Sequence, residues 1–541
     1  MRAQRVFNIG QVFAEAMRAY EEGRPAEARR LARQLVEAKP DFGGAHYLMG
    51  LLAIDQGHAR RAVDHLARAI AITPGQPVLH VTMGKALELD GKIAEATLHY
   101  RTVLSIDANH AEAHARLADL LGRQGRLDEA VAHAHRAVAA HPRHAEAWNT
   151  LGALLHQAER PTEAAEALRH ALELRPDWPA ALNNLGVVLQ ELGRLDDAAT
   201  ILAGAVELKP ANASFRANLA SALRLLGRLD EARSQAERAT RVDGRNADAW
   251  IELGLARQAQ GHMEGAAAAF ERAVAADPRS VHAHYCLAEM RRLAGDGDRA
   301  AAGYRRCLEL DPQDRHGASL GLAQAGGAAP PDKAPEAYVR QLFDDYADSF
   351  DESLVDRLDY KGPALVADAL DRLMGDVPPL DILDIGCGTG LVGEMLKARA
   401  ARLDGVDLSP AMVAKAAQRA IYDDLAVGEL TQVLAERPCR YDLVVAADVL
   451  VYVGDLEPVF GAARDALRSG GRFAFTVERC DMAETYVLGA KNRYAHAPRY
   501  VTETAETAGF DVQLIEEAAA RREAGQDVPG LVVVLRKVDS P

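Results

Sequence analysis

A glycine-rich loop in the C-terminal half of the chain has the composition of a nucleotide-binding turn. The run Leu380-Asp-Ile-Leu-Asp-Ile-Gly-Cys-Gly-Thr-Gly390 begins as a short apolar strand, and a helical pattern begins at about Leu391. Gly386, Gly388 and Gly390 permit a tight turn and let a ligand lie against bare backbone. The start of the following helix offers unpaired N–H groups. The pattern predicts a ligand held by backbone at the end of a strand.

Three carboxylates are placed to complete such a site. The next predicted strand along the chain ends in Asp407, where a carboxylate accepts hydrogen bonds from both hydroxyls of a ribose. Asp384 lies just before Gly386, where it can meet a cationic ligand. A further strand over residues 441–450 carries Asp448 near its end.

The glycines alone also suit NAD, because Gly388, Gly390 and Gly393 form G-x-G-x-x-G. Several segments together favour another ligand. LDIGCGTG, GVDLSPAMV and YDLVVAADVLVYV resemble, in order and in spacing, the motifs of class I S-adenosylmethionine-dependent methyltransferases. The resemblance covers about residues 336–540 and implies S-adenosylmethionine as the cofactor. It also implies an α/β Rossmann-like domain with a seven-stranded sheet whose last strand is antiparallel.

The same resemblance implies roles for individual residues. The methionine moiety would be held by Asp384 and the loop Gly386, Gly388 and Gly390, and the ribose by Asp407. Met412 would pack on the adenine, with Glu429 and Leu430 beside it, and Asp448 would lie near cofactor and acceptor. Many relatives have aspartate where this chain has Glu429, so the role of that residue stays open.

Two segments resemble a subgroup in which tetratricopeptide repeats are fused to a methyltransferase. In residues 338–350, Phe343, Tyr346 and Phe350 recur on one helical face, as a lid over the cofactor or as core packing; both interpretations stay open. Residues 489–500 form a predicted loop that is either an acceptor pocket or plain surface.

In that loop, Arg493 and Arg499 would grip an anionic acceptor, and His496 would take a proton. His496 and Asp448 are the candidate catalytic bases for a hydroxyl or amine acceptor. A carboxylate acceptor would need no base. The alternative function is an interaction scaffold whose C-terminal domain binds the nucleotide without transferring methyl groups.

The first part of the chain is built from a sequence repeat with a period of about 34 residues. A small residue recurs with this period at Ala16, Gly50, Gly84, Ala118, Gly152, Gly186, Ala220, Gly254 and Ala288. An alanine recurs with it at Ala28, Ala62, Ala96, Ala130, Ala164, Ala198, Ala232, Ala266 and Ala300, and a proline at Pro40, Pro74, Pro142, Pro176, Pro210, Pro278 and Pro312. Small residues let two helices approach closely, and proline ends the second helix. The pattern resembles the tetratricopeptide repeat family and predicts an all-α solenoid of nine repeats over residues 9–314.

The resemblance implies a concave groove that binds a protein or peptide. Asn184 and Asn218 match groove asparagines of related solenoids, with Asn149 and Asn183 one position earlier, although a solvated helix face explains them equally. The histidines of this region are interpreted as solvated surface residues rather than metal ligands: His110, His114, His133, His135, His141 and His144.

Composition limits the class of protein and its partners. The 541 residues carry a net charge of −15; residues 336–541 hold 36 acidic and 22 basic side chains, which disfavours a nucleic-acid substrate. Five widely spaced cysteines exclude a disulfide framework and a CxxC zinc site. No apolar run predicts membrane insertion or a signal peptide, so a cytoplasmic location is expected. Residues 315–335 are predicted to be a capping helix and an exposed linker, and residues 336–541 the methyltransferase domain.

Overall fold

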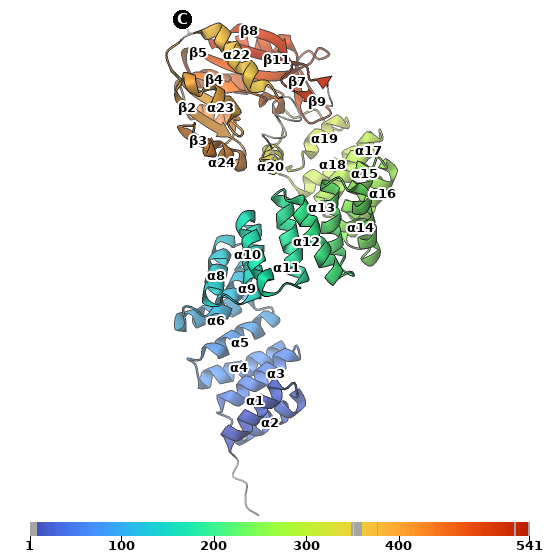
Figure 1. The fold of residues 1–541 in the computed structure, drawn as a ribbon, viewed down its shortest axis with the longest axis vertical. Coiled ribbons are helices and arrows are strands. Elements are labelled where there is room, and N and C mark those ends of the chain that lie inside the picture. Colours follow the sequence, from blue (N-terminus) through green and yellow to red (C-terminus); the bar gives the residue numbers. More distant parts are fainter. Residues whose placement is uncertain (1–7, 348–349, 351–359, 376, 524–525, 539–541) are drawn as a thin grey trace, which may run out of the picture. The chain divides into compact units, whose positions relative to one another are not determined.

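The computed structural model describes residues 8–347, 350, 360–375, 377–523 and 526–538 (Figure 1). The chain forms two compact units, residues 1–235 and residues 236–541. Helices fill the first unit and the beginning of the second, and a sheet with flanking helices follows.

Eighteen helices occupy the described residues between 8 and 314, and they come in pairs whose starts recur at a constant interval. The pairs are α1 (Ile9–Glu21) and α2 (Pro25–Ala38), α3 (Gly43–Asp55) and α4 (Ala59–Ile72), α5 (Pro77–Leu89) and α6 (Ile93–Ile106), α7 (Ala111–Arg123) and α8 (Leu127–Ala140), α9 (Ala145–Gln157) and α10 (Pro161–Leu174), α11 (Pro179–Glu191) and α12 (Leu195–Leu208), α13 (Ala213–Leu225) and α14 (Leu229–Val242), α15 (Ala247–Ala259) and α16 (Met263–Ala276), and α17 (Val281–Leu293) and α18 (Gly297–Leu310). The predicted all-α repeat solenoid is confirmed.

The small residue in each first helix makes room for a large side chain of the second helix. A Cβ atom at Gly186 would lie 2.4 Å from Leu202 Cγ, and one at Gly84 would lie 2.5 Å from the ring of Tyr100. In both pairs the partner follows the glycine at the same spacing along the chain. Glycine therefore sets the distance between paired helices where the partner is large.

We expect Gly186→Ala to destabilise the repeats by about 1–3 kcal/mol, because the added methyl group overpacks the contact with Leu202. Gly204→Ala is the matched control, since a Cβ atom there meets only Leu182 Cδ1 at 4.0 Å. Urea unfolding followed by circular dichroism measures both. Equal midpoints for the two variants would contradict the packing account.

Three consecutive repeats contain a contact between two imidazole rings, one from each helix of the pair. The Nδ1 atoms lie 3.3, 2.9 and 2.8 Å apart in the pairs His46–His65, His80–His99 and His114–His133. The first histidine of each pair is buried, and its Nε2 atom bonds to a backbone carbonyl in the turn that precedes its helix. The interpretation of His114 as a solvated surface residue was therefore wrong, because the helix pair encloses it.

The imidazole pairs predict that the repeats lose stability in acid. Burial lowers the pKa of His65, His99 and His133 below the usual 6.5, and the facing histidine lowers it further. The unfolded chain therefore binds more protons below about pH 6.5, so this stability is complete above that pH and is lost as the pH falls. We expect a lower urea midpoint at pH 5 than at pH 7.

A matched variant comes from another repeat of the same chain. The positions equivalent to His80 and His99 hold Arg216 and Gln235 there. Arg216 Nη1 donates to Gln235 Oε1 over 2.7 Å. The double substitution His80→Arg with His99→Gln should reduce the change in midpoint between pH 7 and pH 5. An unchanged pH response would refute the role of the imidazole contacts.

The four groove asparagines bond to one another between neighbouring repeats. Asn184 Nδ2 donates to Asn149 Oδ1 over 3.2 Å, and Asn218 Nδ2 donates to Asn183 Oδ1 over 2.8 Å. All four side chains are half-buried. Their amides thus form two separate pairs, each joining neighbouring repeats, instead of being free in solvent.

The segment after the last repeat is attached to the domain that follows. Helix α19 (Ala318–Gln324) lies within the range predicted for a cap. The predicted linker is mostly exposed, at Gly326, Ala328, Ala329, Pro330, Asp332 and Lys333. It is nevertheless tied to the domain that follows: the amide of Ala334 donates to the carbonyl of Tyr452 over 2.8 Å, and Pro331 O accepts from the Tyr494 hydroxyl.

The predicted α/β domain is confirmed, with a central sheet in the order β3-β2-β1-β4-β5-β11-β8. Strands β1 to β5 run parallel to one another, and β11 is antiparallel to both β5 and β8. The strands are β1 (Leu380–Ile385), β2 (Ala400–Asp407), β3 (Asp424–Val427), β4 (Tyr441–Ala446), β5 (Leu467–Arg479), β8 (Phe510–Ala518) and β11 (Gly530–Lys537).

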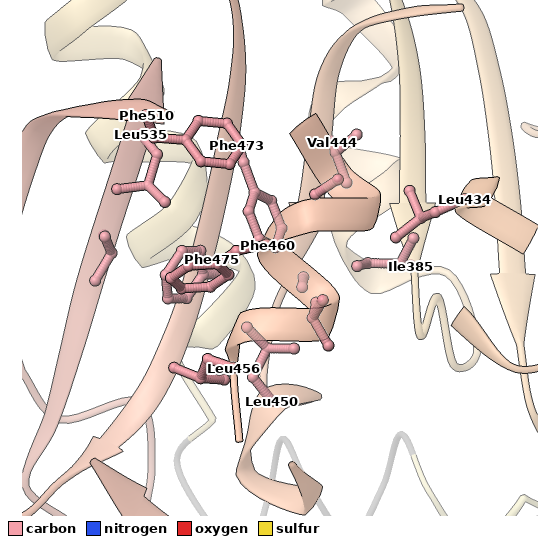
Figure 2. Packing of buried hydrophobic residues seen from close by; sticks show 14 of the residues in the cluster. Ile385, Leu434, Val444, Leu450, Leu456, Phe460, Phe473, Phe475, Phe510 and Leu535 are labelled. Atoms are coloured by element: carbon pink, nitrogen blue, oxygen red, sulfur yellow. The ribbon is translucent and has the colours of Figure 1, made fainter. Parts of the chain in front are cut away.

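Alternate residues of each central strand enter two separate cores. Leu383 and Val444 face one side, together with Phe460, Phe473 and Phe475, and Figure 2 shows these phenylalanines packed together. The residues between them in the strands face the other core. Helices close both faces, which explains why the central strands bury apolar residues on both sides. They are α22 (Gly362–Met374), α23 (Leu391–Leu396), α24 (Pro410–Gln418), α25 (Leu430–Ala435), α26 (Glu457–Ala466) and α27 (Pro498–Thr507).

The predicted loop after β5 instead contains a short hairpin. Strand β6 (Tyr486–Leu488) pairs antiparallel with β7 (Tyr494–His496), and β7 runs parallel to the end of β5. A second hairpin, β9 (Arg522–Glu523) with β10 (Gln526–Asp527), precedes β11. Strands this short show no periodicity in sequence.

Candidate functional site

The candidate site lies where the strand order of the sheet reverses. Strands β2 and β3 extend to one side of β1, and β4 and β5 extend to the other. The glycine loop follows β1, Asp407 is the last residue of β2, and Asp448 follows β4. Ligands of open α/β sheets bind at this reversal, beyond the carboxyl ends of the strands.

The backbone conformation of the loop after β1 requires glycine. The φ angles of Gly386, Gly388 and Gly390 are +67°, +54° and +98°, a region that other residues rarely adopt. A Cβ atom at Gly386 would lie 2.4 Å from Val449 Cγ2. The amide of Gly386 also donates to the carbonyl of Val406 over 2.7 Å, which fixes the loop against β2.

Asp407 joins the glycine loop to the start of the next helix. Its Oδ2 atom accepts from the Gly388 amide at 2.8 Å, and its Oδ1 atom accepts from the Ser409 amide at 2.9 Å. The side chain is almost buried but still lines the pocket. Burial raises its pKa, while the two amides act in the opposite direction. Each carboxylate oxygen retains a lone pair for a further donor.

Asp384 lies beneath the loop in the interior of the domain. Its Oδ2 atom accepts from the Tyr422 hydroxyl over 2.7 Å, and Oδ1 has no hydrogen-bond partner of good geometry among the described residues. Burial raises its pKa to about 7, and the Asp407 charge adds to the effect. A buried carboxylate oxygen without a donor is the kind of group that a cationic ligand or its hydration water satisfies.

The described residues enclose a pocket at this edge of the sheet. It is lined by Lys333, Ala334, Glu336, Val339, Phe343, Phe350, Tyr360, Gly386, Gly388, Val406, Asp407, Leu408, Gly428, Glu429, Leu430, Ala447, Asp448, Val449, Tyr452, Val453 and Arg493. Six of the predicted site residues are therefore together in one cavity wall: Gly386, Gly388, Asp407, Glu429, Leu430 and Asp448. Asp384, Gly390 and Met412 lie outside that wall.

Met412 and Glu429 each lie at the start of a helix, α24 and α25. Met412 is fully buried, and its amide donates to Ser409 Oγ over 3.1 Å. Glu429 caps α25, where its Oε2 atom accepts from the Gln432 amide at 3.0 Å, and it lies 3.5 Å from Lys333 Nζ. The carboxylate of Glu429 is thus held in place at the wall of the pocket.

Asp448 belongs to a charge cluster that sequence reasoning missed. Its φ angle is +60°, and its carboxylate forms an ion pair with Arg521. Arg521 is only 2% exposed and also pairs with Glu478 and, over 3.1 Å, with Glu523. A buried arginine needs such partners. Arg521 lies in the irregular segment just before β9, and no sequence motif includes it.

The structure does not bring His496 into the pocket. It is fully buried in β7, with Nε2 2.9 Å from the Val453 carbonyl oxygen and 3.1 Å from that of Gly454. Burial lowers its pKa to about 4. Arg499 is also remote from the lining residues and pairs with Glu503 on the exposed face of α27. Only Arg493 of the three candidates in that segment reaches the pocket.

The predicted aromatic lid is partly described. Helix α20 (Glu336–Tyr346) carries Phe343 to the pocket, where its ring contacts Phe350 edge-to-face at a centroid distance of 6.0 Å. Tyr346 is half exposed and does not line the pocket. Asp348 and Ser349 of this segment lie outside the described residues.

The described residues form neither a metal-binding cluster nor a membrane-spanning helix. No group of three or more histidine, cysteine, aspartate or glutamate side chains is arranged to hold a metal ion. No helix among them has the length and apolarity needed to cross a bilayer.

Comparisons with known proteins match both parts of the chain. A family profile described as methyltransferase domain matches residues 383–473. A tetratricopeptide repeat profile matches residues 13–77, 115–181, 183–249, 217–280 and 251–315. A crystal structure of YrrB, a repeat protein with an unusual peptide-binding site, is 26% identical, with a TM-score of 0.30; it covers 34% of this chain and 95% of that one.

The curated relatives of the chain include O-methyltransferases. The ubiquinone biosynthesis O-methyltransferase of Nitrosomonas europaea is 31% identical over 172 residues, which are 30% of this chain and 70% of that protein. The enzyme of the same name from Xylella fastidiosa is 31% identical over 103 residues, 18% of this chain and 42% of that protein. The chain thus spans less than half the length of the Xylella fastidiosa enzyme.

Fold, loop geometry and both profiles agree with one another. Strand order, the left-handed glycines and the carboxylate at the end of β2 occur in the region that the methyltransferase profile covers. The chain belongs to the methyltransferase family, as a tetratricopeptide-repeat protein with a C-terminal methyltransferase domain.

Proposed function

We propose that the protein is an S-adenosylmethionine-dependent methyltransferase. The observation that supports this most is the position of Asp407: its carboxylate organises the glycine loop through Gly388 and still faces the pocket. A ribose bound there would donate hydrogen bonds from both hydroxyls to this carboxylate. Relatives named as O-methyltransferases share this region.

The residues of the site suit the charge and shape of this cofactor. We assign the ribose to Asp407, the adenine side to Glu429 and Leu430, and the methionine end to the loop at Gly386 and Gly388. Asp384 and Met412 would act from beneath, by charge and by packing. The bound cofactor would supply a methyl group already activated on a sulfonium sulfur.

Catalysis in such a site consists mainly of alignment and the exclusion of water. The apolar wall formed by Phe343, Phe350 and Val449 would shield the reacting atoms. Asp448, fixed by Arg521, is retained as a residue near the acceptor. His496 is not retained as a base, because the structure places it away from the pocket.

We further propose that the repeats, divided as residues 9–314, recruit a protein or a substrate for the domain at residues 336–541. Two amide pairs, Asn149 with Asn184 and Asn183 with Asn218, support a groove with fixed amide groups. Exposed peptide backbone is the chemistry that such amides recognise.

Transfer of a labelled methyl group tests the proposal. Full-length protein and methyl-labelled S-adenosylmethionine would be added to an extract separated into proteins and small molecules. We expect label in one fraction, and none with Asp407→Ala. Cofactor binding without any transfer would favour the alternative, a nucleotide-binding scaffold, and the absence of both would refute the proposal.

A further inference from the structure

The part of the pocket that is not assigned to the cofactor is an apolar chamber with a single arginine. Phe343, Phe350, Tyr452 and Val453 form its walls, and Arg493 reaches into it from the β6–β7 hairpin. The rings of Phe343 and Tyr452 meet edge-to-face at a centroid distance of 5.6 Å. The chamber therefore favours a ligand with an apolar body and one polar group.

Arg493 is held in a fixed position. Its Nη1 atom donates to Glu523 Oε1 over 2.7 Å and lies 3.9 Å from Glu478 Oε1. Its carbonyl accepts from the Gly489 amide at 2.7 Å, which closes the hairpin turn. The side chain is 24% exposed. A guanidinium has five N–H donors, so donors remain for a ligand.

The partners of Arg493 are shared with other cations. Glu523 also pairs with Lys491 and Arg521, and Glu478 also pairs with Arg521. Lys333, the other described cation of the pocket wall, differs because Glu336 and Glu429 both approach it, at 2.8 and 3.5 Å. Arg493 is thus better placed than Lys333 to accept an additional anion.

Apart from Asp407, which is assigned to the ribose, the described lining residues supply no free general base. Asp448 is paired with Arg521, and Glu429 and Glu336 are paired with Lys333. Burial raises the pKa of the Tyr360 and Tyr452 hydroxyls, so both keep their protons near neutral pH. A hydroxyl or amine acceptor would have to lose a proton here, whereas a carboxylate acceptor is already deprotonated.

We infer that the methyl acceptor is a carboxylate on a small apolar or aromatic body, bound through Arg493. This inference rests on the proposed function. One carboxylate oxygen donates an electron pair to the methyl carbon as the carbon–sulfur bond breaks, and the electrons of that bond return to the sulfur. No proton moves, and the products are a neutral methyl ester and a neutral thioether.

The charge change also gives a reason for product release. The carboxylate binds Arg493 through charge-assisted hydrogen bonds, which are about twice as strong as neutral ones. The ester carries no charge and keeps only weak contacts with the guanidinium. We therefore expect Arg493 to discriminate between the acid and its methyl ester.

Calorimetry with full-length protein saturated with S-adenosylhomocysteine tests the inference. The probes are acetate, hexanoate and benzoate, with methyl benzoate as the neutral counterpart. We expect benzoate or hexanoate to bind, and Arg493→Gln to weaken that binding about 10- to 100-fold, the loss typical of a charged hydrogen bond. Arg493→Lys should retain part of the affinity, because it keeps the charge but loses the planar fork.

Arg499→Gln is the matched control, because Arg499 lies in the same segment but is 85% exposed and paired with Glu503. Its benzoate affinity should equal that of the native protein. Thermal unfolding of each variant shows whether the domain is folded. No binding by any of the three acids, equal binding by Arg493→Gln, or equal binding of methyl benzoate would overturn the inference. Failure to bind S-adenosylhomocysteine would instead refute the proposed function.

Discussion

Replacing Asp407 by alanine should remove measurable binding of S-adenosylmethionine. A hydrogen bond to a charged group contributes about 1.5–3 kcal/mol, and the two ribose hydroxyls would both be served by this carboxylate. Their loss weakens binding by about 100- to 10,000-fold. The variant also loses the acceptor for the Gly388 amide, so the loop is less well fixed. Isothermal titration calorimetry measures the effect.

A second carboxylate of the same domain provides the control. Glu506 is exposed on α27 and does not line the pocket. Glu506→Gln removes the same unit of charge and should bind the cofactor like the native protein. Asp407→Asn, which keeps the size of the side chain but not its charge, should fall between the two. Native affinity in Asp407→Ala would show that the ribose is not bound at this residue.

The second large effect is expected for Gly386→Ala. An alanine at φ +67° costs about 1–2 kcal/mol, and the Cβ atom would lie 2.4 Å from Val449 Cγ2. Overpacking of that kind costs about 1–3 kcal/mol more. We expect the loop to shift and the affinity for S-adenosylhomocysteine to fall at least 100-fold, as measured by calorimetry.

The clash and the backbone strain can be separated. Adding Val449→Ala to Gly386→Ala relieves the contact but not the φ angle, so affinity should recover only in part. Gly461→Ala is the control, because nothing lies within 4 Å of a Cβ atom at that position of α26. Its stability should be equal to that of the native protein or up to about 1 kcal/mol higher. A single variant Gly386→Ala that behaves like Gly461→Ala would contradict the account of the loop.

The parts of the fold that repeat or alternate were predictable from the sequence. The constant repeat length gives every helix pair, since proline and glycine mark the ends of the helices and small residues mark their contacts. The strand before Gly386 and the acid at Asp407 were predictable for a similar reason. Their function depends on local backbone geometry, and local geometry leaves a clear pattern of residue types.

Features that depend on distant partners were not predictable in this way. The tertiary fold brings Arg521 to Asp448 and Glu478. The numbers of residues that separate Arg521 from each of them do not correspond to any motif. The sequence around His496 predicts a polar loop, but β7 carries this residue into the interior beside β5. Contacts of this kind follow from topology rather than from spacing.

The imidazole pairs leave a regular pattern in the sequence. His46, His80 and His114 occupy one repeat position, and His65, His99 and His133 occupy another. A polar residue that recurs at a fixed position of a solenoid has the same surroundings in each repeat. Comparing equivalent positions predicts contacts between them that residue type alone does not.

A crystal structure of the full-length protein with S-adenosylhomocysteine tests the central claim most directly. The account predicts the nucleoside between the loop at residues 386–390 and Asp407, with both ribose hydroxyls within hydrogen-bond distance of that carboxylate. It predicts the thioether sulfur on the side of the pocket that leads to the aromatic chamber. Ligand bound elsewhere, or an empty pocket at saturating concentration, would contradict the account.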